Sequence, residues 1–322
     1  MKVRFAVSAG AGRPDPAELK GFVTVAERLG FDTLWFSDLP VLPSTDPMLS
    51  VAMAAAWTER IKLGVNLVPF GYEPFVFARQ VAQLDRLSGG RLLLTIVPGL
   101  DQPGERGALG IGKAHRGNLL DDLIPKLRSF WAGDTVGAGG AVEASDASGA
   151  GGGVEAGDAS GAGGGVEAGS APEEIPALPT TPLQDPLEIW LGGSGPEAVV
   201  RAGRLSDGWL GSLMTPARAE EIKVRIEQEA TAAGRTIDPE HFGLSIGYAR
   251  EKSDLERTTP IRRRPPVDLS EVVPIGRQGL RDLVGDLIDS GLSKFVVRRI
   301  APASSSEDEL AWLADSLLDL QT

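Results

Sequence analysis

A glycine- and serine-rich turn at residues 192–195 is the part of this sequence best suited to binding chemistry. A short apolar stretch at residues 187–191 leads into this turn, and Pro196 then opens a helical pattern. Glycines let an anion approach the main chain, and the first turn of a helix offers unpaired N–H groups at the positive end of its dipole. The turn therefore predicts a phosphate-binding site, and a tight strand-to-helix turn without a ligand is the alternative.

Acidic and imidazole side chains near the middle of the chain could move protons. Asp101 and Glu105 stand in a polar stretch, and His115 precedes a helical pattern. A general acid or base needs reach and a suitable pKa, so all three are candidates, although His115 could equally be a surface residue at a helix start. The neighbouring sequence GALGIGKA, residues 107–114, nearly matches the phosphate-loop pattern GxxxxGK[ST], but Ala114 replaces the hydroxyl that would hold magnesium.

The composition argues against several other kinds of site. The 322-residue chain has no cysteine and two histidines, so we expect neither a thiolate centre nor a histidine-rich one and predict no metal. Its net charge of −12 argues against nucleic acid or an anionic membrane as a partner. The sequence has no apolar run of about 18 residues and no apolar signal segment, which predicts a cytoplasmic protein.

The elements that must position these residues alternate between strand and helix patterns. Helical spacing of apolar residues follows each of eight predicted strands, which are residues 3–6, 33–36, 61–68, 91–97, 187–191, 208–210, 242–248 and 294–297. Eight such pairs predict an α/β fold, a single (β/α)8 TIM barrel forming one domain over residues 1–322. Chemistry in such a barrel belongs to the loops at the C-terminal strand ends, here residues 37–46, 66–74, 98–112, 192–195 and 211–215.

Residues 137–172 interrupt this alternation with three copies of a twelve-residue repeat, the first being GAGGAVEASDAS. Each copy has one valine and no aromatic residue, so it cannot bury enough apolar surface to offset the entropy of ordering. We predict a disordered linker. A functional lid is the alternative, and because the segment joins the fourth helix to the fifth strand, we expect it in that case to hang over the barrel mouth.

Four segments of the chain form a recognisable set. They are AERLGFDTLWFSD at 26–38, TERIKLGVNLVP at 58–69, QLDRLSGGR at 83–91 and IWLGGSGPEAVVRAGRLSDGW at 189–209. In this order and spacing they resemble the bacterial-luciferase-like flavin and deazaflavin oxidoreductases, over nearly the whole chain except the repeat and residues 250–266. That family has a TIM barrel and binds FMN or the 8-hydroxy-5-deazaflavin coenzyme F420 at the C-terminal strand ends.

The resemblance implies roles for individual residues. Asp38 matches a position that lines the flavin or deazaflavin pocket. Asn66 and Leu67 match the place where the deazaflavin branch has a non-prolyl cis peptide bond behind the ring. Ser212 matches a position that faces the substrate in sugar-phosphate-oxidising relatives. The residues that match the phosphate-contacting turn and helix start are Gly193, Ser194, Gly195, Glu197 and Ala198.

Two departures from the family pattern bear on the reaction. Leu39 and Leu100 stand where the deazaflavin-dependent sugar-phosphate dehydrogenases have a catalytic histidine and glutamate, so we do not expect that reaction and favour an apolar organic substrate. The resemblance implies an oxidoreductase that transfers a hydride to or from a small molecule, with F420 favoured over FMN, and a homodimer. An FMN-dependent monooxygenase and a non-catalytic flavin-binding barrel are the alternatives, and the catalytic residues stay unassigned.

Overall fold

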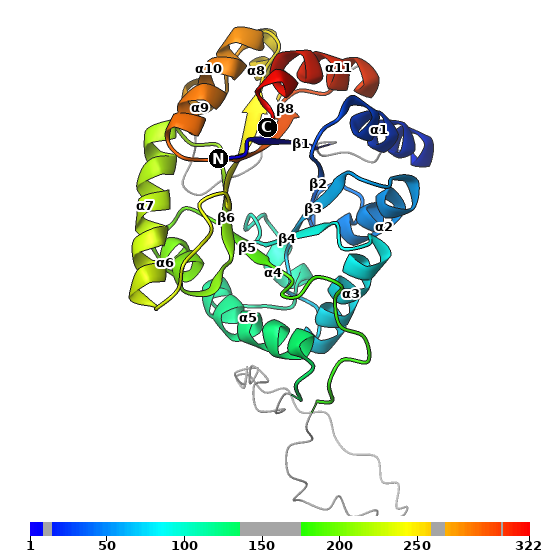
Figure 1. The fold of residues 1–322 in the computed structure, drawn as a ribbon, viewed down its shortest axis with the longest axis vertical. Helices are drawn as coiled ribbons and strands as arrows, with labels where there is room; N and C mark the ends of the chain where they lie inside the picture. The colour runs from blue at the N-terminus through cyan, green and yellow to red at the C-terminus, as the bar shows by residue number, and fades with distance from the viewer. Residues whose placement is uncertain (9–14, 136–174, 259–267, 304) are drawn as a thin grey trace, which may run out of the picture.

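Strands and helices alternate along the chain as predicted (Figure 1). The computed structural model describes residues 1–8, 15–135, 175–258, 268–303 and 305–322. The strands are β1 (Arg4–Ser8), β2 (Thr33–Ser37), β3 (Lys62–Leu67), β4 (Leu92–Ile96), β5 (Ile189–Gly192), β6 (Gly208–Ser212), β7 (Phe242–Tyr248) and β8 (Lys294–Arg299). The longer helices are α1 (Pro16–Leu29), α2 (Pro47–Trp57), α3 (Pro74–Leu87), α5 (Arg116–Ala132), α6 (Pro196–Leu205), α7 (Pro216–Ala232), α10 (Gly276–Asp289) and α11 (Ser306–Leu317). The short ones are α4 (Glu105–Ala108), α8 (Ser253–Glu256), α9 (Leu269–Val272) and the 3-10 turn Leu318–Leu320.

The eight strands are parallel and close into a barrel in sequence order. Closure is made by β1, where Ala6 pairs with Thr33 of β2 on one side and with Val296 of β8 on the other. The helices form an outer ring around the strands, and both ends of the chain lie beside β1 (Figure 1). This arrangement confirms the predicted TIM barrel.

Signals in the sequence explain where the helices begin and end. The side chain of Asp15 accepts from the main chain of Ala17 and Glu18, and Glu18 returns a bond, so a capping box starts α1. Gly30 ends the same helix with φ of 93°, a left-handed conformation that favours glycine. Asp46 caps α2 in the same way as Asp15 caps α1. The caps at Asp15 and Asp46 end the loops that come from the barrel mouth, and the stop at Gly30 returns the chain to the start of β2.

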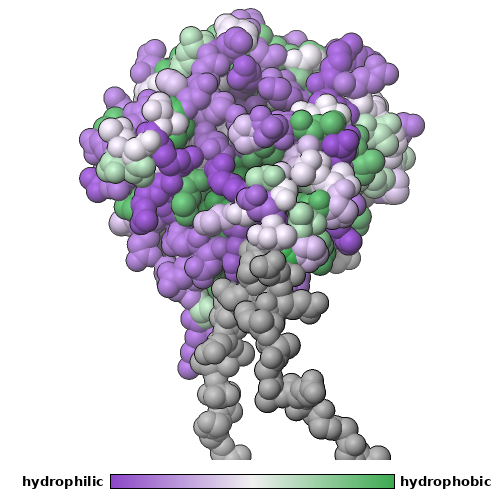
Figure 2. All heavy atoms as spheres, turned by 60° about the horizontal axis from the view of Figure 1, so that its bottom comes forward, coloured by the Kyte–Doolittle hydropathy of each residue, from purple (hydrophilic) through white to green (hydrophobic). Residues whose placement is uncertain are grey.

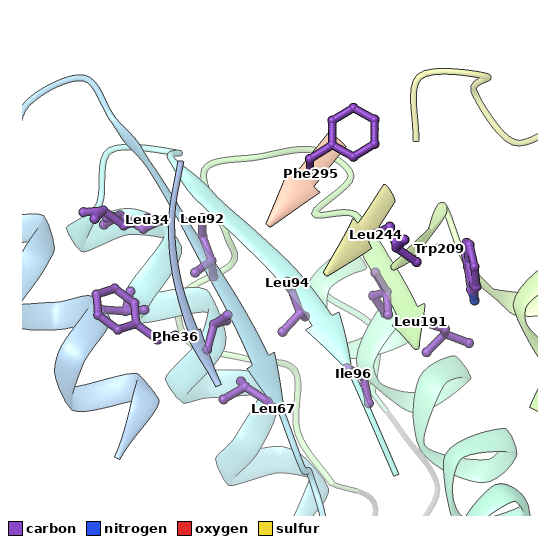
Figure 3. Close-up of a cluster of buried hydrophobic side chains, with 14 of the residues drawn as sticks. Leu34, Phe36, Leu67, Leu92, Leu94, Ile96, Leu191, Trp209, Leu244 and Phe295 are labelled. Atoms are coloured by element: carbon purple, nitrogen blue, oxygen red, sulfur yellow. The ribbon is translucent and has the colours of Figure 1, made fainter. Parts of the chain in front are cut away.

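Side chains alternate along each strand between an outer and an inner core. The outer core lies between the barrel and its helices, and Figure 3 shows ten of its members, among them Leu67, Trp209 and Phe295. The inner core fills the barrel and consists of Ala6, Trp35, Trp190, Leu210 and Val296. It is small, and Leu93, which packs against it, is only half-buried.

The connection from α5 to β5 begins and ends at the N-terminal end of the barrel. Each helix in this topology returns the chain to the start of the next strand, opposite the mouth. Accordingly, the Gln184 side chain, in the described part of this connection, donates to the carbonyl of Leu92 at the start of β4 (2.9 Å). The described ends of the connection thus lie opposite the mouth, and a functional insertion over the mouth stays a prediction. Residues 137–172 themselves lie outside the described residues.

The surface of the protein is mainly hydrophilic on the face shown in Figure 2, with hydrophobic side chains in small separate groups. The large apolar side chains that are exposed come from different elements: Leu49 in α2, Leu87 in α3, Val224 in α7 and Ile275 before α10. In the described part of the chain, no helix has both the length and the apolar character needed to cross a bilayer.

Gly203 allows α6 and α7 to pack closely, and its replacement has a clear expected outcome. A Cβ at this position would lie 2.7 Å from the carbonyl oxygen of Ile226 and 2.8 Å from the main-chain nitrogen of Ala230. Because backbone atoms cannot move aside cheaply, we expect Gly203→Ala to lower the free energy of unfolding by about 2–3 kcal/mol. Urea unfolding measures this. Gly285→Ala in α10 is the control: a Cβ there meets nothing within 4 Å, so we expect about 0.5–1 kcal/mol of stabilisation.

Candidate functional site

Polar side chains line the inner face of the barrel at its C-terminal end. Most of them follow an inner-core residue, or Leu93 packed against it, by two positions, and Asn66 and Ser245 lie opposite such residues, so all point the same way. This polar ring consists of Ser8, Ser37, Asn66, Thr95, Ser212, Ser245 and Arg298. Ser37 is exposed, and Asn66, Ser212 and Ser245 are half-buried, so solvent reaches the ring. The mouth is therefore an open polar site above an apolar barrel interior.

Asp38 directly follows β2 and stands at the rim of the mouth. Its main-chain N–H donates to the carbonyl of Asn66 (2.9 Å), and its carboxylate accepts from the N–H of Val68 (3.1 Å). Burial raises the pKa of Asp38 to about 6, with smaller contributions from the negative charges of Asp46 and Glu105. A half-buried carboxyl with a pKa near neutral can both give and take a proton at working pH. Asp38 is accordingly the strongest proton-handling candidate at the mouth.

The Asn66–Leu67 segment differs from the expectation drawn from the family. Asp185–Pro186 is the cis bond recorded among the described residues, and the bond between Asn66 and Leu67 is trans. The reason is the regular pairing of β3 with β4, in which Asn66 lies opposite Thr95, because this ladder runs through both residues. The Asn66 side chain faces the mouth, whereas that of Leu67 packs in the outer core (Figure 3).

Three buried polar atoms on β2, β3 and β4 have no hydrogen-bond partner. They are the indole nitrogen of Trp35, the side-chain oxygen of Asn66 and the hydroxyl of Thr95. The amide nitrogen of Asn66 is used, since it donates to the hydroxyl of Ser37 (3.1 Å). Buried polar groups are normally paired, so a cluster of unpaired ones on neighbouring strands indicates a place for a polar ligand. Asn66 and Thr95 lie opposite each other, so an acceptor and a hydroxyl are available together for the polar edge of a flavin-type ring.

The turn after β5 provides the predicted anion-binding features. Gly193 has a φ of 109°, and a Cβ on it would lie 2.9 Å from the Cβ of Ala198. Gly195 is the N-cap of α6, and no side chain caps that helix, so its first N–H groups are open to a ligand. A guanidinium nitrogen of Arg218 lies 3.5 Å from the carbonyl oxygen of Ser194. The turn therefore combines free amides with a nearby cation.

The first turn of α6 also contains an acidic group. Glu197 is exposed, and its carboxylate lies 3.4 Å from the Nε2 atom of His115. His115 is the N-cap of α5, and its Nδ1 atom lies 3.2 Å from the side-chain oxygen of Asn118. His115 thus occupies the helix-start position that the sequence left as the alternative, next to the predicted phosphate site.

The carboxylates of the β4 loop form ion pairs that support the loop. Glu105 is buried and accepts from Arg116 (2.6 Å), while Asp101 pairs with Arg106 (3.0 Å) and Arg116 (3.3 Å). Gly99 has a φ of 80°, and any Cβ on it would collide with the Glu105 carboxylate. Glu105 is thus a structural residue, which the sequence could not reveal because its partner, Arg116, lies beyond the loop.

Ser212 is the last residue of β6 and lies opposite Ser245 of β7 in the polar ring. The next residue, Leu213, has a positive φ of 47°, and Asp101 in the β4 loop has one of 54°. Among the described non-glycine residues these two have positive φ, and both lie in loops at the C-terminal end of the barrel. Backbone strain of this kind concentrates at functional sites.

The site so described contains residues that sequence reasoning missed. Trp35, Thr95 and Arg298 were not candidates, although alternation along their strands could have placed all three inside the barrel.

In the described ranges, no group of three or more histidine or acidic side chains could hold a metal ion.

Comparison with known proteins identifies relatives of this chain. The family model described as luciferase-like monooxygenase matches residues 1–258. An F420-dependent glucose-6-phosphate dehydrogenase of Microbacterium testaceum is 25% identical over 253 residues, which cover 74% of this chain and 66% of the relative. A 5,10-methylenetetrahydromethanopterin reductase of Methanolobus tindarius is 27% identical over 233 residues, covering 72% and 60%. The chain thus spans less than two thirds of the length of these curated relatives.

Solved structures share the fold over the full chain. An F420-dependent secondary alcohol dehydrogenase, in complex with an F420–acetone adduct, superimposes with a TM-score of 0.74 at 15% identity, covering 100% of both chains. A long-chain alkane monooxygenase superimposes with a TM-score of 0.70 at 13% identity, covering 99% of this chain and 92% of the other. The family model covers most of the chain, and the barrel agrees with it. This protein belongs to the luciferase-like monooxygenase family.

Proposed function

We propose that this protein is an oxidoreductase that uses a deazaflavin coenzyme of the F420 type to transfer a hydride to or from a small organic substrate. The observation that carries the proposal is Asp38, a carboxyl group with a pKa of about 6 at the rim of an open polar mouth. Support also comes from the F420-dependent relatives, although the chain spans only part of their length. The coenzyme would supply the hydride chemistry, and the protein would supply orientation and proton transfer.

Residues at different places around the mouth would bind the coenzyme, transfer the proton and contact the substrate. The turn at Ser194 would hold the anionic tail of the coenzyme on the free amides at the start of α6, with Gly193, Gly195, Glu197 and Ala198 around it. The unpaired side-chain atoms of Asn66 and Thr95 would bond to the polar edge of the ring. Asp38 would hold or accept the proton that accompanies hydride transfer, and Ser212 would face the substrate. The Ser194 turn and Asp38 both follow C-terminal strand ends, so they lie at the same end of the barrel.

A monooxygenase reaction with FMN is the second candidate. A limonene 1,2-monooxygenase of Rhodococcus erythropolis is 31% identical over 116 residues, which is 34% of this chain and 29% of that protein. Titration of the purified protein with F420 and with FMN, followed by intrinsic fluorescence, separates the two candidates. Turnover of the reduced coenzyme is then measured with enals, imines and cyclic ketones, with and without oxygen. Binding without turnover on the whole panel would favour a non-catalytic barrel, and failure to bind either coenzyme would overturn the proposal.

A charge placed in the turn tests where the coenzyme binds. We expect Ser194→Asp to weaken coenzyme binding at least about tenfold, because a carboxylate would repel the anionic tail from the helix start. Ser194→Ala keeps the main-chain amides and is expected to change the affinity less than threefold or so. The fluorescence titration measures both variants. Equal affinity of the wild type and Ser194→Asp would place the anionic tail elsewhere.

The proposal also covers the setting of the reaction. We propose that the protein works in the cytoplasm as a homodimer, without a metal and without nucleic acid or a membrane as partner. The net charge of −12 supports the last point, because such partners require a basic surface. Light scattering of the purified protein tests the dimer, and a monomer at working concentration would contradict it.

A further inference from the structure

Arg298 points into the barrel mouth from the end of β8. Its strand neighbours Phe295 and Val297 pack in the outer core, whereas Val296 belongs to the inner core. Alternation along the strand therefore turns Arg298 inward, two residues above Val296. The residue beside it on β7 is Gly247, which brings no side chain of its own next to the guanidinium.

The guanidinium of Arg298 has no hydrogen bond or ion pair with any described residue, in contrast to its neighbour on the strand. Arg299 faces outward and binds the carboxylate of Asp254 (2.7 Å) and that of Glu309 (3.1 Å). Burial lowers the pKa of Arg298, and no carboxylate opposes this shift. An unpaired guanidinium in a partly buried place is costly to the fold, so its presence there indicates a ligand that pairs with it.

Neutral hydroxyls and an apolar wall lie on the β7 side of Arg298. Ser245 of β7 lies opposite Val296, one step below Arg298, and Ser212 of β6 lies opposite Ser245. Above these hydroxyls, Leu213 and Ile300 cover Gly247, since their side chains would lie 3.2 Å and 2.8 Å from a Cβ on that glycine. Leu213 belongs to a small buried cluster with Ala249, Val272 and Val273, against which Ile300 packs. Five N–H donors and two hydroxyls suit an oxyanion, and the wall suits a hydrocarbon skeleton.

We propose that Arg298 binds a carboxylate group of the substrate, so that the substrate class is an organic acid with an apolar skeleton. This inference rests on the proposed function, because it assumes that the coenzyme occupies the β2–β5 side of the mouth. It also revises the apolar substrate expected from Leu39 and Leu100, because a guanidinium in the mouth requires a charged end on the substrate. A role of Arg298 in holding the coenzyme is the competing outcome of the test.

Paired acids and amides test the inference through binding rather than turnover. The probes are propionate, hexanoate and 3-phenylpropionate with their primary amides, titrated calorimetrically into the wild type and into Arg298→Met and Arg298→Lys. We expect the wild type to bind at least one acid about tenfold or more tightly than its amide, a preference lost in Arg298→Met and partly kept in Arg298→Lys. Equal or absent binding of all pairs in the wild type, or a preference that persists in Arg298→Met, would overturn the inference.

Thermal unfolding separates a ligand-binding role from a structural one. Arg298→Met removes an unpaired charge, so we expect an unchanged or higher unfolding temperature. Arg299→Met is the matched control, since it breaks a buried ion pair one residue away and is expected to lower that temperature by several degrees. A comparable loss in both variants would show that Arg298 is structural.

Titration of the wild type and Arg298→Met with F420 and FMN distinguishes failure of the carboxylate site from failure of the proposed coenzyme function. If Arg298→Met weakens coenzyme binding tenfold and the wild type shows no preference for acids, the residue belongs to the coenzyme site and the inference fails while the proposed function stands. If neither F420 nor FMN binds but the acid preference depends on Arg298, the proposed function fails and the carboxylate site stands.

Discussion

Asp38→Asn is expected to reduce coenzyme-dependent turnover by about 10²–10⁴-fold, the usual contribution of a positioned general acid or base. Asparagine keeps the size of the side chain and can still accept from the N–H of Val68, so the loop should retain its conformation. What it loses is the ability to exchange a proton. Steady-state kinetics with the best substrate from the panel measures the effect, and Asp122→Asn, an exposed change on α5, is the control.

Turnover should depend on pH in opposite ways for the two directions of the reaction. Because the pKa of Asp38 is raised to about 6, the carboxylate form predominates above pH 6. Substrate oxidation, which needs a base, should therefore increase as the pH rises from 5 to 7, and substrate reduction should decrease. Both changes should disappear in Asp38→Asn. If the variant keeps wild-type turnover and the same profile, another group moves the proton.

The same substitution is expected to stabilise the fold. A carboxyl whose pKa is higher in the folded than in the unfolded protein contributes stability at low pH, which is lost as the pH rises through about 6. At pH 7 the ionised Asp38 is thus a cost, of about 1–2 kcal/mol once its partial exposure is allowed for. Asp38→Asn should unfold at a higher temperature than the wild type at pH 7 and at nearly the same temperature at pH 4.

Asp254→Asn is expected to lower the free energy of unfolding by about 3–5 kcal/mol. Asp254 is fully buried, and its two carboxylate oxygens accept from Arg299 (2.7 and 2.9 Å) and from the main chain of Arg250 (2.8 Å). The amide of asparagine would leave the buried Arg299 guanidinium without its main counter-charge. Urea unfolding at pH 7 measures the loss.

An exposed pair provides the control for Asp254. Asp319 binds Arg281 through two hydrogen bonds of 2.7 and 2.9 Å but is largely solvent-exposed, so Asp319→Asn should cost much less than Asp254→Asn. The ion pairs hold the pKa of Asp254 below its usual range, so its contribution is present at neutral pH and is lost as the pH falls through that lowered pKa. The difference between wild type and Asp254→Asn should shrink accordingly in acid. Similar costs for the two variants would mean that burial does not strengthen the Asp254 pair.

The barrel could be predicted from the sequence because its signals are local. Apolar periodicity, the cap at Asp15 and the stop at Gly30 each depend on a few neighbouring residues, and every predicted strand is present. The family follows from the combination of four segments with their spacing. The roles of Ser194 and Ser212 stay predictions, because ligand contacts do not follow from the fold alone. The disordered linker at residues 137–172 also stays a prediction, since it lies outside the described residues.

The parts of the site that sequence reasoning missed depend on distant partners. Glu105 resembles a free catalytic carboxylate until Arg116 is placed against it, and Asp254 gives no sign of its bond to Arg299, 45 residues away. The cis bond expected between Asn66 and Leu67 is absent. The expectation was taken from the family, whereas the pairing of this strand is regular. Arg298 is different, since simple alternation in β8 would have placed it in the mouth.

The closure of the barrel by β1 and β8 affects how the chain can fold as it is made. Of the barrel strands, β1 is made before the others and soon has β2 as a neighbour, but its other edge stays unpaired until β8 has been synthesised. Contacts between segments far apart in the sequence form late and slowly. An open sheet with an unpaired β1 edge would therefore precede the closed barrel, and such an edge is a template for pairing with strands of other chains.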